Sequence, residues 1–244
     1  MKFVQNHNND FLDKRKLIFF PIPAIIWKSK RGDRQCVILT DALANSEENI
    51  CTVKKRSEMK NNVYVTRHGE SRWNVEGKVQ GITDTPLTDK GRDQARELAL
   101  RIKADDPGID LIIASTLSRA DETARILSEI TGIPMESEPR LIEQNFGEYE
   151  GHEWKKHPGV FHEAKKQFAY DYNGGESMLR LGQRIFNLLD EIRERMIRED
   201  KTFLLVTHGG IVRMINAYFN SESNEEFSST SIDNCELREF RFPE

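Results

Sequence analysis

The sequence of 244 residues contains few cysteines, and the three present are Cys36, Cys51 and Cys235. Their positions show no spacing typical of a metal site, and an odd number does not suit a framework of disulfides. Sparse, unpaired cysteines fit a reducing compartment. We therefore expect a cytoplasmic protein with no cysteine-bound metal.

Long apolar runs are also missing. The longest, residues 17–27, contains Pro21 and Pro23 and falls well short of the roughly 20 residues that a membrane helix needs. A basic stretch precedes this apolar run, as in a signal peptide. However, the two prolines interrupt the apolar run and no small-residue cleavage pattern follows it, which argues against a signal peptide. The formal net charge of -4 lacks the basic excess of nucleic-acid proteins. We expect no membrane or nucleic-acid partner, and any affinity for anions must be local to a pocket.

Composition changes near residue 59. Before this point the sequence is Asn-rich, then apolar, then polar, whereas strand and helix patterns alternate regularly after it. Met59 directly precedes the first predicted strand, and codons for Arg56 and Ser57 can encode a ribosome-binding sequence. One hypothesis is that translation starts at Met59 and that residues 1–58 are not part of the protein. The alternative is a real, weakly ordered extension, and in both cases residues 59–244 form the predicted domain.

The alternating pattern predicts an α/β protein. An unbroken apolar run such as residues 203–206 is typical of a central strand covered on both faces. We therefore predict a three-layer α/β/α sandwich with a mostly parallel central sheet. The predicted strands are residues 63–66, 111–114, 203–206 and 235–240, and the predicted helices are residues 91–104, 118–130, 177–198 and 211–219.

Two of the predicted strands end in histidine. His68 follows the first strand within YVTRHGES, and His208 follows a later strand within THGG. Because ligands bind beyond the carboxyl ends of parallel strands, the two histidines can converge. Arg67 stands beside His68, and Gly69 would let the backbone crowd a ligand. This pattern predicts an anion site that carries a nucleophile.

A third strand end leads to Arg119, in the first turn of its helix. Taken alone, this arginine could be an ordinary solvated helix residue. With Arg67 it could form a pair of guanidinium groups suited to phosphoryl oxygens. The glycines after His208, beginning at Gly209, would add backbone N–H groups and the positive end of a helix.

Five sequence blocks extend this pattern, and they read RHGESRWNVEGKVQGITDTPLTDKG, ASTLSRADETA, LIEQNFGEYEGHEW, GGES and LLVTHGGIVR. In this order they resemble the histidine phosphatase superfamily, with its phosphoglycerate mutase-like fold, and within it the bacterial small-molecule phosphatases. The resemblance covers residues 59–244. It implies hydrolysis of a small phosphorylated substrate through a phosphohistidine intermediate, with no metal and no cofactor, and it leaves a homodimer open.

The resemblance also implies a role for each matching residue. His68 would be the nucleophile and Glu143 the proton donor, although Glu143 could instead be a surface glutamate of its acidic loop. A neutral His68 would be favoured by nearby cations, and a protonated His208 would add positive charge. The phosphoryl group would be held by Arg67, Arg119 and His208 with Asn74 as a further donor, and Gln80, Ser115 and Gly209 would line the same pocket.

Hydrolases and mutases share this machinery, so the acceptor of the phosphoryl group stays open. Mutases of this fold resemble longer chains with a tyrosine-bearing ERHYG-type motif, whereas this sequence has EQNFGEYEG, which favours a hydrolase. A protein phosphohistidine phosphatase is less favoured, because the minimal members lack the glutamate donor. A noncatalytic relative would be expected to lose His68 or a phosphate-binding residue. Substrate choice is expected to lie in residues 154–172, where lysines and aromatics could cap the pocket or form a solvated face.

Overall fold

The computed structural model describes residues 24–30, 33–39, 61–164 and 166–243. The chain divides at residue 59 into two units, which we describe separately. In the first, strand β1 (Ala24–Lys30) pairs antiparallel with strand β2 (Asp33–Leu39). The sequence pattern does not predict this hairpin, because its first strand begins inside an apolar run broken by prolines. The hypothesis of a start at Met59 falls mostly on residues outside the described ones, and it stays a prediction.

The second unit contains a five-stranded sheet in the order β5-β4-β6-β3-β7. All neighbouring strands are parallel except β7, which runs antiparallel to β3. The predicted fold class is therefore confirmed. The edge strand β5 is not predicted, because its three residues include no buried side chain and leave no apolar run. The strands are β3 (Asn62–Arg67), β4 (Leu111–Ala114), β5 (Met135–Ser137), β6 (Phe203–Thr207) and β7 (Leu237–Arg241).

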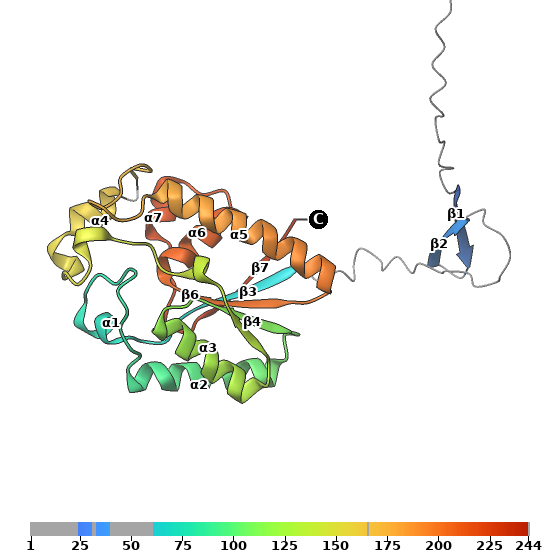
Figure 1. Ribbon diagram of the computed structural model, residues 1–244, viewed down its shortest axis with the longest axis horizontal. Helices are drawn as coiled ribbons and strands as arrows, with labels where there is room; N and C mark the ends of the chain where they lie inside the picture. Colours follow the sequence, from blue (N-terminus) through green and yellow to red (C-terminus); the bar gives the residue numbers. More distant parts are fainter. Residues whose placement is uncertain (1–23, 31–32, 40–60, 165, 244) are drawn as a thin grey trace, which may run out of the picture. The chain divides into compact units, whose positions relative to one another are not determined.

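Helices cover both faces of this sheet (Figure 1). Helices α2 (Asp89–Asp105) and α3 (Ser118–Thr131) pack on one face, and α5 (Met178–Glu199) and α6 (Gly209–Phe219) pack on the other. Side chains of β6 alternate between the two cores, so the whole strand is buried. All of its residues except the last, Thr207, are apolar. Burial of each large apolar side chain stabilises the fold by about 1.5–3 kcal/mol.

The long helices agree closely with prediction, but α6 begins at Gly209 rather than at residue 211. His208 has extended backbone angles and serves as the N-cap, so both glycines that follow it are helical. The shorter elements are not predicted, because a segment of so few residues is too short to display an apolar periodicity. They are α1 (Arg72–Glu76), α4 (Pro158–Ala164), α7 (Asn224–Ser229) and the 3-10 turns η2 (Pro139–Leu141), η3 (Gly147–Tyr149) and η4 (Trp154–Lys156).

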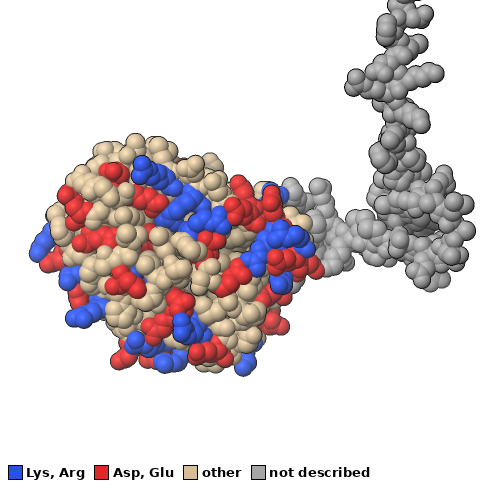
Figure 2. All heavy atoms as spheres, viewed as in Figure 1, with Lys and Arg blue, Asp and Glu red and all other residues tan. Residues whose placement is uncertain are grey.

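Acidic and basic side chains are interspersed over the face of the molecule in Figure 2. The surface on this side therefore shows no broad field of one sign. Among the helices that the structure describes, none has the length and apolar character needed to cross a bilayer.

Candidate active site

The two histidines that follow strands lie side by side. Strands β3 and β6 are parallel neighbours with Arg67 opposite Thr207, so both end at the same edge of the sheet. His68 and His208 come next, and the His68 amide donates a hydrogen bond to the Thr207 carbonyl at 2.9 Å. Their ring centroids are 5.1 Å apart, with the planes tilted by 57°. The predicted convergence of the two histidines is confirmed.

His68 is held as a neutral imidazole with one nitrogen free. The residue is only 3% exposed. Its Nδ1 lies 2.7 Å from the Gly69 carbonyl oxygen, which can only accept, so Nδ1 carries the proton and Nε2 keeps its lone pair. Burial, and then the charges of Arg67 and Arg119, hold the pKa of His68 well below its usual range. The ring is therefore unprotonated at neutral pH, the state in which it can act as a nucleophile.

Gly69 serves packing rather than ligand approach, contrary to expectation. Its amide donates to Thr123 Oγ1 at 3.1 Å. A Cβ at this position would collide with the backbone carbonyl of Gly91 at the start of α2. The glycine is thus required by the close contact between two backbone segments.

His208 is fully buried between β6 and α6. Its Nε2 lies 2.8 Å from Ser115 Oγ, while Nδ1 has no hydrogen-bond partner among the described residues. Burial, followed by the charges of Arg119, His68 and Arg67, holds the pKa of His208 well below its usual range. His208 is therefore held neutral in the protein alone, and its protonation with a phosphoryl group bound stays a prediction. If Ser115 donates to Nε2, the proton of the neutral ring lies on the unpartnered Nδ1.

The two arginines of the predicted pair occupy different layers. Arg67 lines a cavity, donates from Nη1 to the Ile232 carbonyl at 3.1 Å and leaves Nε buried without a partner among the described residues. Arg119 is fully buried outside the cavity lining, where Nη1 and Nη2 donate to the carbonyls of Thr83 at 3.1 Å and Gly81 at 2.7 Å. Burial lowers the pKa of Arg119 to about 10, so it stays charged at neutral pH.

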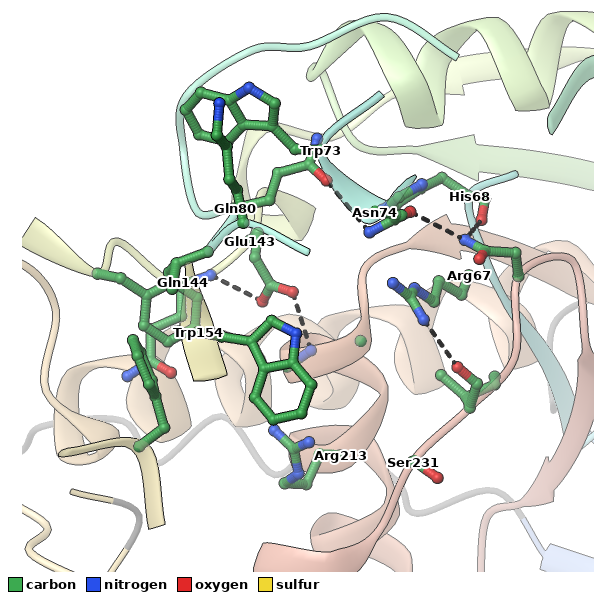
Figure 3. Close-up of a pocket in the computed structure, with 18 of the residues that line it drawn as sticks. Arg67, His68, Trp73, Asn74, Gln80, Glu143, Gln144, Trp154, Arg213 and Ser231 are labelled. Carbon is green, nitrogen blue, oxygen red and sulfur yellow. Dashed lines mark hydrogen bonds between the residues drawn. The ribbon is translucent and has the colours of Figure 1, made fainter. Parts of the chain in front are cut away.

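Gln80 connects Arg119 to the cavity wall. With its amide oxygen turned toward Arg119, Gln80 accepts from Nη1 and Nε at 3.3 Å each, and its nitrogen donates to Ser71 Oγ at 2.6 Å. Asn74 lines the same wall, and its Oδ1 accepts from the Ser71 amide at 3.1 Å. The carbonyl side of Asn74 is thus occupied. Its amide nitrogen, which lies 3.4 Å from the end of the Gln80 side chain in Figure 3, is the group that can donate to a ligand.

Glu143 is a buried residue, only 7% exposed, and not a surface glutamate of its loop. Its Oε1 accepts from the Gln144 amide at 2.8 Å, and its Oε2 accepts from the Gly210 amide at 2.9 Å. Arg184 also donates to the Glu143 carbonyl at 3.3 Å. The carboxylate is therefore fixed at the beginning of α6, beside the two histidines.

These groups surround a cavity of about 540 Å³ (Figure 3). Figure 3 shows His68, Asn74 and Arg67 on one side of this cavity, with Glu143 and Arg213 approaching from the others. Ser115 does not line the cavity as expected, because it is fully buried and supports His208 instead. Of the predicted residues, the cavity is lined by Arg67, His68, Asn74, Gln80, Glu143 and Gly209, whereas Arg119, Ser115 and His208 lie outside the lining.

The sequence pattern misses several residues of the cavity. Asn234 donates to the His68 carbonyl at 2.8 Å from a loop that carries no motif. Arg213 follows Gly209 by one helical turn, and this spacing could have placed it on the cavity side of α6. In residues 154–172 the lining side chains are aromatic, and none of the described lysines of that segment takes part.

The geometry agrees with the comparison to known proteins. A family model described as "Histidine phosphatase superfamily (branch 1)" matches residues 63–244, and the chain belongs to this family. The chain is 37% identical over 152 residues to a probable phosphoglycerate mutase GpmB of Yersinia pestis, a match that covers 60% of this chain and 69% of the relative.

Solved structures show the same similarity. Mycobacterial glucosyl-3-phosphoglycerate phosphatase, in complex with VO3, matches with a TM-score of 0.65 and 26% identity over 74% of this chain and 90% of that chain. YhfR of Bacillus stearothermophilus matches with a TM-score of 0.64 and 32% identity over 74% of this chain and 90% of that chain. The family thus includes phosphatases and mutase-like relatives of this chain.

Proposed function

We propose that this chain is a phosphomonoester hydrolase that acts on a small phosphorylated metabolite through a phosphohistidine intermediate. The observation that carries the proposal is a neutral, buried His68 with Nε2 free, beside two buried nitrogens that lack partners among the described residues, Arg67 Nε and His208 Nδ1. Buried polar groups are nearly always hydrogen-bonded, so unpartnered donors beside a nucleophile indicate where ligand oxygens bind.

The phosphoryl group would bind against these donors. Arg67 Nε, His208 Nδ1 and the Asn74 amide nitrogen would each donate to an oxygen, and the first amides of α6 would add the positive end of a helix. Arg119 would contribute its charge from behind the lining, through Gln80. This arrangement stabilises the charge of a phosphoryl group in transfer, which is the main requirement of such a reaction.

In the first half-reaction, His68 Nε2 attacks phosphorus in line with the ester oxygen. A P–N bond forms while the P–O ester bond breaks, and Glu143, in its protonated form, gives its proton to the leaving alkoxide. In the second, the Glu143 carboxylate takes a proton from water as that water attacks phosphorus. The P–N bond breaks, phosphate leaves, and His68 and Glu143 return to their starting states.

Mutase chemistry is the second candidate, and the similarity to probable phosphoglycerate mutases of Yersinia supports it. It would use the same phosphohistidine but transfer the group to a substrate hydroxyl in place of water. The EQNFGEYEG sequence that begins at Glu143 and the similarity to a glucosyl-3-phosphoglycerate phosphatase favour the hydrolase.

The proposal is tested by measuring phosphate release over a panel of phosphorylated metabolites, beside a mutase assay with 2,3-bisphosphoglycerate. We expect release from one or more compounds, no rapid interconversion of phosphoglycerates, and a phosphoryl adduct on the peptide containing His68 after rapid quenching. His68→Ala should abolish release, whereas His152→Ala, at an exposed histidine, should not. Turnover by His68→Ala would exclude the proposed nucleophile, and rapid interconversion would favour the mutase.

A further inference from the structure

The cavity has room for more than a phosphoryl group. Its volume of about 540 Å³ lies in the range of roughly 300–1,000 Å³ typical of pockets that enclose a whole small molecule. Beyond the residues of the proposed phosphoryl site, its lining contains aromatic side chains and several polar ones, among them Arg213 and Tyr172. Neither Arg213 nor Tyr172 has a part in the proposed phosphoryl transfer.

Arg213 presents an unused edge to the cavity. It lies on α6 one turn beyond Gly209, and Figure 3 shows it on the side of the cavity opposite Gln80 and Trp73. Its Nε donates to the Thr230 carbonyl at 3.0 Å, and its two Nη atoms have no hydrogen bond among the described residues. Burial lowers the pKa of Arg213, but a guanidinium still carries its charge at neutral pH.

Tyr172 is the second unused donor. It is 1% exposed, and its hydroxyl has no hydrogen-bond partner among the described residues. Its ring stacks with Phe161 at 6.0 Å and meets the edge of Phe146 at 5.1 Å, and its φ of 58° lies in the left-handed region. The position of the ring is thus tightly determined by packing and backbone.

Tyr172 lines the same cavity as Arg213 and Glu143. Burial raises the pKa of Tyr172 to about 12, so the phenol stays neutral and can donate a hydrogen bond.

Resting on the proposed function, we propose that Arg213 and Tyr172 bind a carboxylate of the substrate, so that the preferred substrates are phosphomonoesters that also carry a carboxylate. A planar guanidinium edge with a neighbouring phenol fits the two oxygens of a carboxylate. One guanidinium balances one negative charge, whereas a second phosphate dianion would leave an uncompensated charge beside Glu143.

The test compares two substrates that differ only at this group, 3-phosphoglycerate and glycerol 3-phosphate, in which a hydroxymethyl group replaces the carboxylate. The readout is the ratio of their kcat/KM values for phosphate release. The wild-type protein should prefer 3-phosphoglycerate, and Arg213→Met should lower the ratio by roughly 10- to 100-fold. Tyr172→Phe should lower it by about 5-fold, and Arg213→Lys should retain part of the preference. Lys155→Met is the matched control, because this exposed lysine near the cavity is not part of its lining, and it should leave the ratio unchanged.

Each other outcome counts against the inference. Equal loss on both substrates in Arg213→Met and Arg213→Lys would assign Arg213 to the fold or to the common chemistry. A change confined to the pair fructose 1,6-bisphosphate and fructose 6-phosphate would indicate a second phosphate in place of a carboxylate. An unchanged ratio with active enzyme would overturn the carboxylate site while the hydrolase stands. Failure of the wild-type protein to release phosphate from these probes or from p-nitrophenyl phosphate would instead overturn the proposed function.

Discussion

Glu143 and Gly210, which lie 67 positions apart in the chain, are joined by a hydrogen bond of 2.9 Å from the Gly210 amide to the Glu143 carboxylate. A Cβ at position 210 would collide with Glu143 Oε1, so a larger residue there would displace the carboxylate. Gly210 thus determines where the proposed proton donor lies, because the start of α6 and the loop that carries Glu143 meet at this contact.

Substitution of Gly210 should therefore impair catalysis more than folding. Gly210→Ala would displace the Glu143 carboxylate, and a shift of about 1 Å in a reacting group costs on the order of 100-fold in rate. We expect kcat to fall by about that factor, measured by phosphate release. The control is Gly182→Ala in α5, where the added Cβ would make ordinary contact with Met214 Sδ at 3.6 Å and where alanine favours the helix. Equal activity of the two variants would contradict this role of Gly210.

Glu150 is expected to position Arg119 through a loop. Its carboxylate accepts from the amides of Ile82 at 2.9 Å, Thr83 at 2.8 Å and Phe146 at 3.1 Å, and the carbonyls of the same loop hold the Arg119 guanidinium. Glu150→Gln would place an amide nitrogen against one of these donors, which costs about 1–3 kcal/mol.

We expect Glu150→Gln to lower the Tm by about 2–4 °C for each kcal/mol lost and to reduce kcat/KM about 10-fold. Thermal melts and phosphate release measure the two effects. The matched control is Glu148→Gln, because Glu148 is exposed and accepts only from the Asn173 side chain among the described residues. A wild-type kcat/KM in Glu150→Gln would show that this loop does not position Arg119.

Acid should destabilise the fold through the two buried histidines. Their pKa values are held well below the usual range in the folded state, so below about pH 6.5 the unfolded chain takes up protons that the folded chain does not. The two histidines therefore do not reduce the free energy of unfolding above about pH 6.5. Below that pH the free energy of unfolding decreases as the pH falls, by up to about 1.4 kcal/mol per pH unit for each histidine. Urea denaturation between about pH 7.5 and about pH 5.5 measures this decrease.

His208→Asn should show a shallower decrease than the wild-type protein over this interval, since one buried titrating group is removed. His152→Asn, at an exposed histidine, should keep the wild-type slope. Identical slopes in all three proteins would mean that burial of His208 does not oppose its protonation.

Phosphate release should not depend on a divalent metal. The positive charge that binds the phosphoryl group is expected to come from Arg67 and Arg119, both of which stay protonated at neutral pH despite burial. Dialysis against EDTA should leave kcat/KM within about twofold of the untreated protein. Loss of activity that is restored by a divalent ion would contradict the arginine-based site.

Much of the fold follows from local pattern. The strand of residues 111–114 is predicted with its observed bounds, because four consecutive apolar residues between polar segments are typical of a buried central strand. The short elements escape prediction, and α1 shows why. Its five residues include no buried side chain, and only the reciprocal hydrogen bonds between Ser71 and Asn74 mark its beginning.

The site is predicted well where two adjacent strands end, and the family resemblance also implies Asn74, Gln80 and Glu143, which line the cavity. His68 and His208 converge as expected, since residues that follow adjacent parallel strands share one edge of the sheet. Arg119 is predicted to face the ligand beside Arg67, but it points instead to two backbone carbonyls. That choice depends on a loop about 36 residues earlier, and local sequence contains no information on such a contact.

The sequence by itself determined which chemistry the chain can carry: a histidine and an arginine at the end of one strand, a second histidine at the end of another, and a layered α/β fold that brings strand ends together. The tertiary structure alone decided which side chains reach the cavity. It buried Arg119 and Ser115 beyond the lining, set Gly69 against Gly91 and turned Arg213 and Tyr172 inward. The physical reason is that strands and helices arise from periodicity along the chain, whereas the direction of a side chain at a site depends on the packing of segments far apart in sequence.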